Sequence, residues 1–189
     1  VLPVIATDPD IRVVMITGEG GAFCAGGDVK GFAASHKSAG TSRPVSAEQG
    51  INRLRTIQRQ VSLAIRRLPQ PVVASFPGAA AGAGLSIGFA ADLRIAAERA
   101  IIVTAFANIG ASGDFGTSWF LPRIVGEAKA KELMFMSPRL SARDALAMNV
   151  VNAVLPNEGY EEAALSWCHE LASRAPVALQ YIKQNINRS

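Results

Sequence analysis

Short apolar runs alternate along this chain with longer stretches in which apolar residues recur every three or four positions. Residues 11–17 (IRVVMIT) and 72–76 (VVASF) are β-branched runs bounded by Gly or Pro, which indicates strands buried on both faces. Further strands are expected around residues 93–96 and 150–155. Strands that alternate with helices are typical of an α/β fold with a largely parallel sheet.

Helical spacing is clearest over residues 47–68, and Pro69 and Pro71 end that helix. Ser141 is a suitable N-cap for a later helix. Residues 37–50, which mix Ser, Gly, Thr and Pro, are expected to form a mobile surface loop. The remaining helices are predicted at residues 84–91, 117 to just before Pro122, 127–136, 141–149, 160–175 and 177–187.

The bulk composition limits the class of protein. A chain of 189 residues with 49% hydrophobic residues suits one globular domain, and no apolar run reaches the ~18 charge-free residues of a membrane span. Pro3 and Asp8 interrupt the first apolar stretch, so we do not expect a signal peptide. Cys24 and Cys168 lie far apart, which argues against a disulfide or a zinc site and favours a reducing, cytoplasmic location.

The net charge of +4 is modest, and the basic residues are scattered except for one cluster. Nucleic-acid binding would require a higher density of basic residues with interleaved aromatics, and the sequence has neither. The cluster has two interpretations: a solvated helix face, or a surface for the phosphates of an anionic ligand. Its members are Arg53, Arg55, Arg59, Arg66 and Arg67.

Two segments rich in Gly and Ala each follow a predicted buried strand: GEGGAFCAGGDVKGF at residues 18–32 and PGAAAGAGLSIGFAADLRIA at residues 77–96. Small residues allow a ligand to approach the backbone, and free N–H groups at the start of a helix favour negative charge. Two such turns facing one another would form an oxyanion hole. The alternative is that the glycines only permit tight turns and close packing.

These segments resemble the two oxyanion segments of the crotonase (enoyl-CoA hydratase/isomerase) family. The similarity continues through FANIGASGDFGTSWFLPRIVG (106–126) and LSARDALAMNVVNAVLP (140–156), so it covers nearly the whole chain. The resemblance implies a single domain over residues 1–189 with a spiral of ββα units. Relative to the family, part of an N-terminal β segment and of the C-terminal helices is expected to be missing.

The resemblance also implies a substrate and an assembly. The substrate would be an acyl-CoA thioester, with no metal, flavin or nucleotide cofactor beyond the CoA of the substrate itself. A homo-oligomer, either a trimer or a dimer of trimers, would be the assembly, and fatty acid metabolism the setting. The backbone N–H groups of Ala25 and Ala83 would be the oxyanion donors. The further substrate- and CoA-binding residues would be Phe23, Cys24, Gly26, Lys30, Gly82 and Phe106.

The acid–base residues depart from the hydratase pattern. Where hydratases of the family use two glutamates, this chain has Ser86 and Phe106, and neither can act as a carboxylate base. Asp114 remains, at a position where some isomerases of the family place a catalytic aspartate. A single carboxylate facing an enolate could move a proton between two carbons, and burial would raise its pKa. Isomerase-type chemistry is therefore the preferred prediction.

Several alternatives stay open at this point. Asp114 could simply cap the following helix, the chain could be an atypical hydratase, or it could bind acyl-CoA without catalysis. The family also contains other thioester-enolate reactions. Residues 84–88 (GLSIG) match the nucleophile elbow of serine hydrolases, with Asp114 or Asp144 and His169 as partners. About nine residues separate the preceding strand from Ser86, however, which does not suit an elbow.

The other titratable residues near the motifs are predicted to be structural. Asp28 and Asp92 are expected to hold their turns through hydrogen bonds to the backbone, and Cys24 to pack as a small apolar residue. His36 is expected at the surface.

Overall fold

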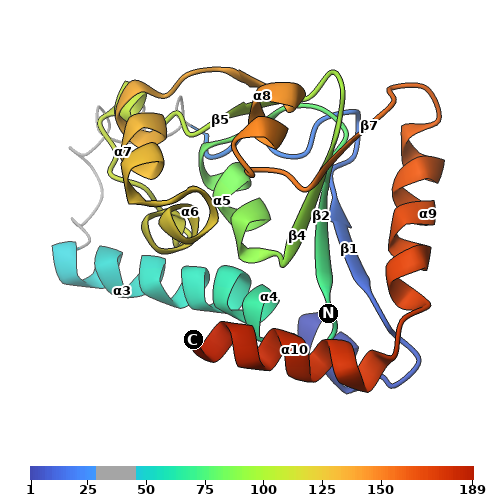
Figure 1. The fold of residues 1–189 in the computed structure, drawn as a ribbon. Helices are drawn as coiled ribbons and strands as arrows, with labels where there is room; N and C mark the ends of the chain where they lie inside the picture. Colours follow the sequence, from blue (N-terminus) through green and yellow to red (C-terminus); the bar gives the residue numbers. More distant parts are fainter. Residues whose placement is uncertain (29–45) are drawn as a thin grey trace.

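A four-stranded parallel sheet forms the centre of the molecule (Figure 1), in a computed structural model that describes residues 1–28 and 46–189. The strand order is β1-β2-β4-β7, and all three pairings are parallel. The strands are β1 (Val14–Thr17), β2 (Val72–Phe76), β4 (Leu93–Ala97) and β7 (Ala153–Leu155). The predicted α/β class with a largely parallel sheet is confirmed.

The first strand is shorter than its apolar run predicted. Val14 pairs with Val72, and the N–H of Val14 donates to the carbonyl of Pro71. Pro69 and Pro71 have no N–H with which to extend the ladder towards residue 11. The last strand is also shorter, because it begins at Ala153 instead of residue 150.

A second, smaller sheet has the order β3-β5-β6 and consists of β3 (Ala80–Ala81), β5 (Ile101–Val103) and β6 (Leu140–Ser141). β3 and β5 are parallel, whereas β5 and β6 are antiparallel. An isolated parallel bridge between Cys24 and Ala80 joins the segment after β1 to this sheet. The sequence did not predict β3 or β6, since two residues are too few to show a period of two.

The long predicted helix at residues 47–68 is confirmed, with a change of pitch inside it. It comprises α3 (Ala47–Gln58), the π-helix η1 (Arg59–Leu63) and α4 (Ala64–Arg67). Ser46 and Gln49 form a capping box at its start. The loop predicted at residues 37–50 is therefore wrong for residues 47–50, which belong to α3, and its residues 37–45 lie outside the described part of the chain.

The other helices match the predictions to within three residues at each end, apart from the end of α6 and the unpredicted α1 and η2. They are α1 (Leu2–Thr7), α5 (Gly82–Ala90), the 3-10 turn η2 (Ala107–Ile109), α6 (Thr117–Val125), α7 (Glu127–Met136), α8 (Ala142–Ala147), α9 (Tyr160–Ala172) and α10 (Pro176–Arg188). Ser141 caps α8 as predicted, in a capping box with Asp144. In the described part of the chain, none of the helices combines the length and the hydropathy of a membrane span.

The prediction that a helix would end before Pro122 is wrong, because α6 continues to Val125. Pro122 is the sixth residue of α6, so its missing N–H removes only one intrahelical hydrogen bond. The buried Phe120 and Leu121 anchor this turn in the core, and the carbonyl of Pro122 accepts a hydrogen bond from Gly126. Packing therefore outweighs the local cost of the proline.

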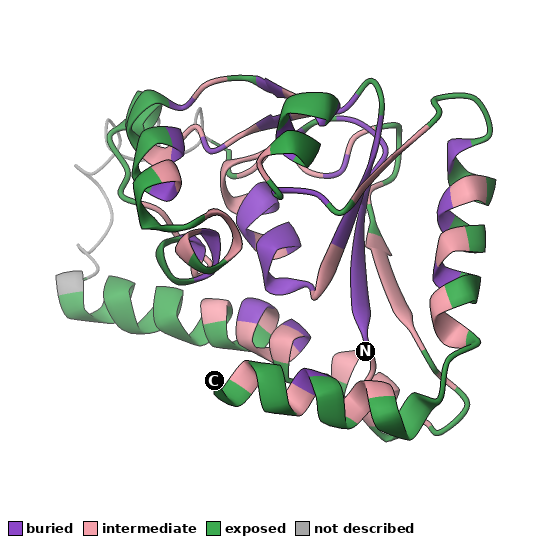
Figure 2. Cartoon of the chain, in the orientation of Figure 1, coloured by how far each residue is buried: buried purple, intermediate pink, exposed green. Residues whose placement is uncertain are grey.

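The central sheet is covered on both faces, by α5 on one side and α9 on the other (Figure 1). β2 is buried along its whole length (Figure 2). Val72, Ala74 and Phe76 pack into the cluster that contains α5, whereas Val73 packs with Tyr160 of α9. This two-sided burial explains why β2 reads as a continuous apolar run.

The C-terminal helix α10 is attached to the body through a buried ion pair. Nζ of Lys183 lies 2.6 Å from Oδ2 of Asp92 and donates to the carbonyl of Gln70 at 2.9 Å. Asp92 also accepts a hydrogen bond from the backbone N–H of Val72 at 2.8 Å, so its predicted role in holding the turn is confirmed. Burial lowers the pKa of Lys183, and Asp92 opposes this effect.

Candidate functional site

The described part of the first Gly/Ala-rich segment, residues 18–28, lies beside the second segment, and each follows directly after a strand of the central sheet. The N–H groups of Phe23 and Cys24 both donate to the carbonyl of Ala79, at 2.9 and 3.2 Å. In return, the N–H of Ala81 donates to the carbonyl of Cys24 at 2.9 Å. These three hydrogen bonds fix one segment against the other.

Glycine is required where the two segments approach most closely. A Cβ atom at Gly84 would lie 2.4 Å from Cβ of Cys24 and 2.6 Å from its carbonyl oxygen. A Cβ atom at Gly26 would lie 3.0 Å from the carbonyl oxygen of Ala81 and 3.5 Å from the nitrogen of Ala83. The backbone around Ala25 and Gly26 therefore lies against the first turn of α5.

The predicted oxyanion donors occupy this contact. Ala83 is the second residue of the nine-residue helix α5, so its N–H is one of the four without an acceptor further back in the helix. Among residues 1–28 and 46–189, no hydrogen bond outside the regular helices and strands uses the N–H of Ala25 or of Ala83. The positive end of the α5 helix dipole adds a favourable potential for negative charge in the same region. Such an arrangement can bind an oxygen atom that gains negative charge.

The other residues predicted around the oxyanion donors contribute their backbone more than their side chains. Phe23 is buried, and its ring packs on Phe76 with 4.7 Å between the centroids. Gly82 has a φ of +49°, which places the chain at the entrance to α5 in the left-handed region. Cys24 is half-buried and packs against the core, as predicted. Lys30 and His36 lie outside the described residues.

Ser86 and Phe106, which stand where hydratases carry glutamates, are both buried. Ser86 is completely inaccessible; its hydroxyl donates to the carbonyl of Gly82 at 3.0 Å and contacts the hydroxyl of Thr117. Phe106 is 4% exposed and follows Ala105, whose φ is +61°. Neither side chain supplies a carboxylate.

The serine-hydrolase alternative does not fit the structure. Ser86 lies inside α5, one turn after its start, and not on a sharp turn after a strand. Asp144 is engaged in the capping box of α8. His169 is exposed on α9, on the opposite face of the sheet from α5 (Figure 1). The three residues therefore form no triad.

Asp114 lies on a tight turn before α6 in which its neighbours have left-handed conformations. The φ angles are +110° at Gly113, +45° at Phe115 and +85° at Gly116. A positive φ is costly for a residue such as Phe115, and strained residues of this kind gather at functional sites. The carbonyl of Asp114 accepts hydrogen bonds from N–H and Oγ1 of Thr117, at 2.9 and 3.0 Å.

The carboxylate of Asp114 does not cap α6. Gly116 is the N-cap, without a side-chain hydrogen bond, so the capping alternative is wrong. Oδ1 of Asp114 is buried and has no hydrogen-bond partner among the described residues. Burial raises the pKa of Asp114, as predicted. A partly buried carboxylate with an unused, inaccessible oxygen and a raised pKa is suited to acid–base chemistry.

Sequence reasoning missed Thr117, which links the two sides of the site. Its hydroxyl contacts Ser86 of α5 and donates to the backbone of Asp114. Because α5 begins at the oxyanion segment, this pair of contacts connects the acid to the backbone donors. A Thr three residues after an Asp is a spacing at which side chains commonly bond to backbone, and that signal was available in the sequence.

Comparisons with known proteins show which family and which solved structures this chain is similar to. Residues 1–189 match the family model described as enoyl-CoA hydratase/isomerase. An enoyl-CoA hydratase from Polaromonas sp. JS666 is 36% identical, with a TM-score of 0.86 over 99% of this chain and 70% of that one. An enoyl-CoA hydratase from Bacillus anthracis is 33% identical, with a TM-score of 0.84 over 98% of this chain and 68% of that one. The predicted crotonase-type fold is thereby confirmed.

Proposed function

This chain belongs to the enoyl-CoA hydratase/isomerase family, and we propose that it acts on an acyl-CoA thioester by isomerase-type proton transfer. The observation that carries the proposal is the state of Asp114. It is a lone carboxylate with a raised pKa and an unpaired buried oxygen, beside positions that have lost both hydratase glutamates.

The proposed reaction begins at the backbone wall, the surface formed by the two Gly/Ala-rich segments around Ala25 and Ala83. The thioester oxygen accepts hydrogen bonds from the N–H groups of Ala25 and Ala83, each of which would stabilise the transition state by about 3 kcal/mol. The carbonyl then becomes an electron sink, and the proton on C2 becomes acidic. Phe23, Cys24, Gly26 and Gly82 would present backbone to the CoA ester.

Asp114 would then act as base and acid in turn. In a 3-enoyl ester its carboxylate takes the proton from C2, and the electron pair of that C–H bond enters a dienolate. The protonated Asp114 returns the proton to C4, the C2–C3 double bond forms, and the enolate collapses to the thioester. Proton, electrons and charge balance without a cofactor or a water molecule.

Hydration is less well supported because it requires acid–base groups for water. The Ser86 hydroxyl is already bound to Gly82 and Thr117, and Phe106 has no polar atom. Neither position therefore supplies a carboxylate for the ordinary hydratase mechanism, which uses two.

The proposal includes a cytoplasmic location and assembly as a trimer or a dimer of trimers. Both come from sequence reasoning: the location from the cysteine content, the assembly from the family resemblance. A role in fatty acid metabolism has the same standing.

The experiment offers purified protein a 3-enoyl-CoA and a 2-enoyl-CoA in parallel, with products separated by chromatography and mass spectrometry. We expect the isomer without addition of water. A 3-hydroxyacyl-CoA product would overturn the mechanism, since another base would then have to replace the missing glutamates. Binding of both esters without turnover would instead identify an acyl-CoA binder.

A further inference from the structure

A cavity of about 370 Å³ lies between the helix formed by α3, η1 and α4 and the start of α6. Phe115 and Gly116, the two residues after Asp114, form part of its lining. Trp119 and Phe120 of α6 and Leu63 of η1 supply further apolar wall. The cavity therefore opens next to the turn that holds the proposed acid, and a group of a few carbon atoms fits its volume.

One face of the long helix gives this apolar cavity a positive charge. Arg55, Arg59 and Arg66 line it, and their spacing of four and seven residues places them on one side of the helix. Within the described residues none of the three guanidinium groups forms an ion pair or a hydrogen bond. No acidic residue lines the cavity, and residues 29–45 contain no Asp or Glu.

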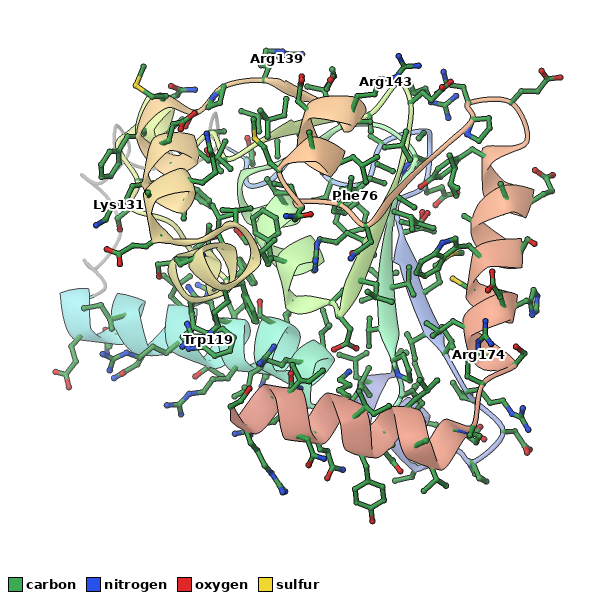
Figure 3. All side chains as sticks on the ribbon, viewed as in Figure 1. Phe76, Trp119, Lys131, Arg139, Arg143 and Arg174 are labelled. Carbon is green, nitrogen blue, oxygen red and sulfur yellow. The ribbon has the colours of Figure 1, made fainter. Side chains whose placement is uncertain are left out.

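Arg66 is held at the inner end of this face by an aromatic ring. Its guanidinium lies 4.4 Å from the centroid of Trp119, which projects from α6 towards the α3–α4 helix (Figure 3). Burial lowers the pKa of Arg66; Asp92 opposes that effect and Arg123 adds to it. A bound anion would relieve this partly desolvated positive charge.

A buried hydroxyl without a partner points to a polar group in the ligand. Ser62 is 4% exposed and lines the cavity, and its Oγ has no hydrogen-bond partner in the described structure. An unpaired buried hydroxyl is costly, so it indicates a missing partner. Ser62 lies on η1, and π-helical turns are rare elements that occur frequently at functional sites.

We propose that this cavity binds the distal end of the acyl group and favours acyl-CoA esters that carry a carboxylate there. The aromatic and aliphatic walls would cover the methylene groups. Arg59 and Arg66 would bind the carboxylate by charge-assisted hydrogen bonds, and the Ser62 hydroxyl would donate a further one. This inference rests on the proposed function, because it assumes that a thioester lies at the adjacent backbone wall.

The phosphates of CoA are the other anions that these arginines could bind. Two features favour the acyl carboxylate. The cavity walls are mostly apolar, as an acyl chain requires, and the unpaired Ser62 hydroxyl is buried among them. Phosphates that stay in contact with solvent need neither feature.

Isothermal titration calorimetry with unreactive saturated esters separates these possibilities without requiring turnover. The probes are succinyl-, glutaryl- and adipyl-CoA, each paired with the monocarboxylic ester of equal carbon number, together with free CoA. The variants are Arg59→Gln and Ser62→Ala, with Arg59→Lys to retain the charge. Arg53→Gln is the matched control, because Arg53 lies on the same helix but does not line the cavity.

We expect the wild-type protein to bind at least one carboxylated ester about tenfold more tightly than its partner. Arg59→Gln should remove most of this preference, and Ser62→Ala should remove part of it. Arg59→Lys, which keeps the charge, should reduce the preference less than Arg59→Gln does. Arg53→Gln should keep it, and free CoA should bind all variants equally.

Three results would overturn the inference. Equal binding of the paired esters by the wild-type protein would exclude a carboxylate site while leaving the proposed function intact. Equal weakening of free CoA and of every ester by Arg59→Gln would assign the arginines to the CoA phosphates. Failure of free CoA and of all esters to bind would remove both this inference and the proposed function.

Discussion

Backbone groups form one wall of the candidate site, whereas side chains form the other. On the first wall, segments around Ala25 and Ala83 are fixed by three backbone hydrogen bonds and by glycines that permit close contact. On the second, Asp114 supplies the carboxylate, from a strained turn held by Thr117. The two walls should therefore respond to mutation differently.

The two walls should also differ in how freely their residues can vary. A backbone donor works with any side chain that leaves its N–H in place, so Ala can stand at residues 25 and 83. The acid wall has no such freedom, because in the proposed reaction the carboxylate of Asp114 alone carries the proton. Substitutions in the side-chain wall should therefore change the type of reaction. Substitutions that displace the backbone wall should change how well an enolate is stabilised.

The largest effect is expected for Asp114→Asn, which removes the proposed base and keeps the shape of the side chain. We expect kcat to fall by about 10³-fold, within the usual range for a lost general base. Binding of an unreactive acyl-CoA, measured by calorimetry, should change less than about twofold. Activity close to that of the wild type would remove Asp114 from its proposed role.

The next largest effect should come from the backbone wall, in Gly84→Val. The new side chain would begin 2.4 Å from Cβ of Cys24, so the two segments must separate. Overpacking should lower the free energy of unfolding by about 1–3 kcal/mol, measured by urea denaturation. Displacement of the donors should lower kcat/KM by about 100-fold.

Gly50→Ala is the control for this variant. Gly50 lies inside α3, and a Cβ atom there would meet nothing within 4 Å. This substitution should raise the free energy of unfolding by about 0.5–1 kcal/mol, because Ala suits a helix better than Gly. If Gly84→Val behaved like Gly50→Ala, the two segments would not be in tight contact.

A smaller effect is expected where the two walls meet, in Thr117→Val. The substitution keeps the volume but removes the hydroxyl that contacts Ser86 and donates to Asp114. We expect a loss of about 1 kcal/mol in stability and about a tenfold lower kcat, since Asp114 is less firmly placed. Thr56→Val, in which an exposed Thr of α3 loses its bond to the Asn52 carbonyl, should leave kcat unchanged.

The smallest effect is the dependence of stability on pH at Asp114. Burial raises the pKa of this carboxyl, so the folded state binds the proton more tightly than the unfolded state. Ionisation of Asp114 therefore costs stability at neutral pH; the cost begins to shrink as the pH falls to the raised pKa and is gone below the pKa of the unfolded chain. Asp114→Asn should be slightly more stable than the wild type at pH 7, with a difference that vanishes in acid.

Local sequence signals predicted much of the fold. β2 is bounded by prolines, α7 has the predicted ends, and Ser141 caps α8 because each signal acts over a few residues. The passage of α6 through Pro122 could not be predicted, since it depends on core packing around Phe120. The ion pair between Lys183 and Asp92 joins residues far apart in the sequence, so no local sequence pattern predicts it.

The candidate site likewise has a part that the sequence indicates and a part that only the structure shows. The Gly/Ala-rich segments and Asp114 stand out in the sequence because their composition is unusual. The Ser86–Thr117 contact and the unpaired Ser62 hydroxyl do not, because they arise from packing between helices that are far apart in the chain. Sequence thus identifies the two Gly/Ala-rich segments and Asp114 as candidates, and structure is needed for what surrounds them.

The most direct test of the central claim follows exchange of the C2 proton of an acyl-CoA in deuterated water, by mass spectrometry. With a saturated ester the reaction cannot proceed to product, so exchange reports only enolate formation and the base. The wild type should incorporate deuterium, and Asp114→Asn should not, although both bind the ester. Equal exchange by both proteins would contradict the claim that Asp114 moves the proton.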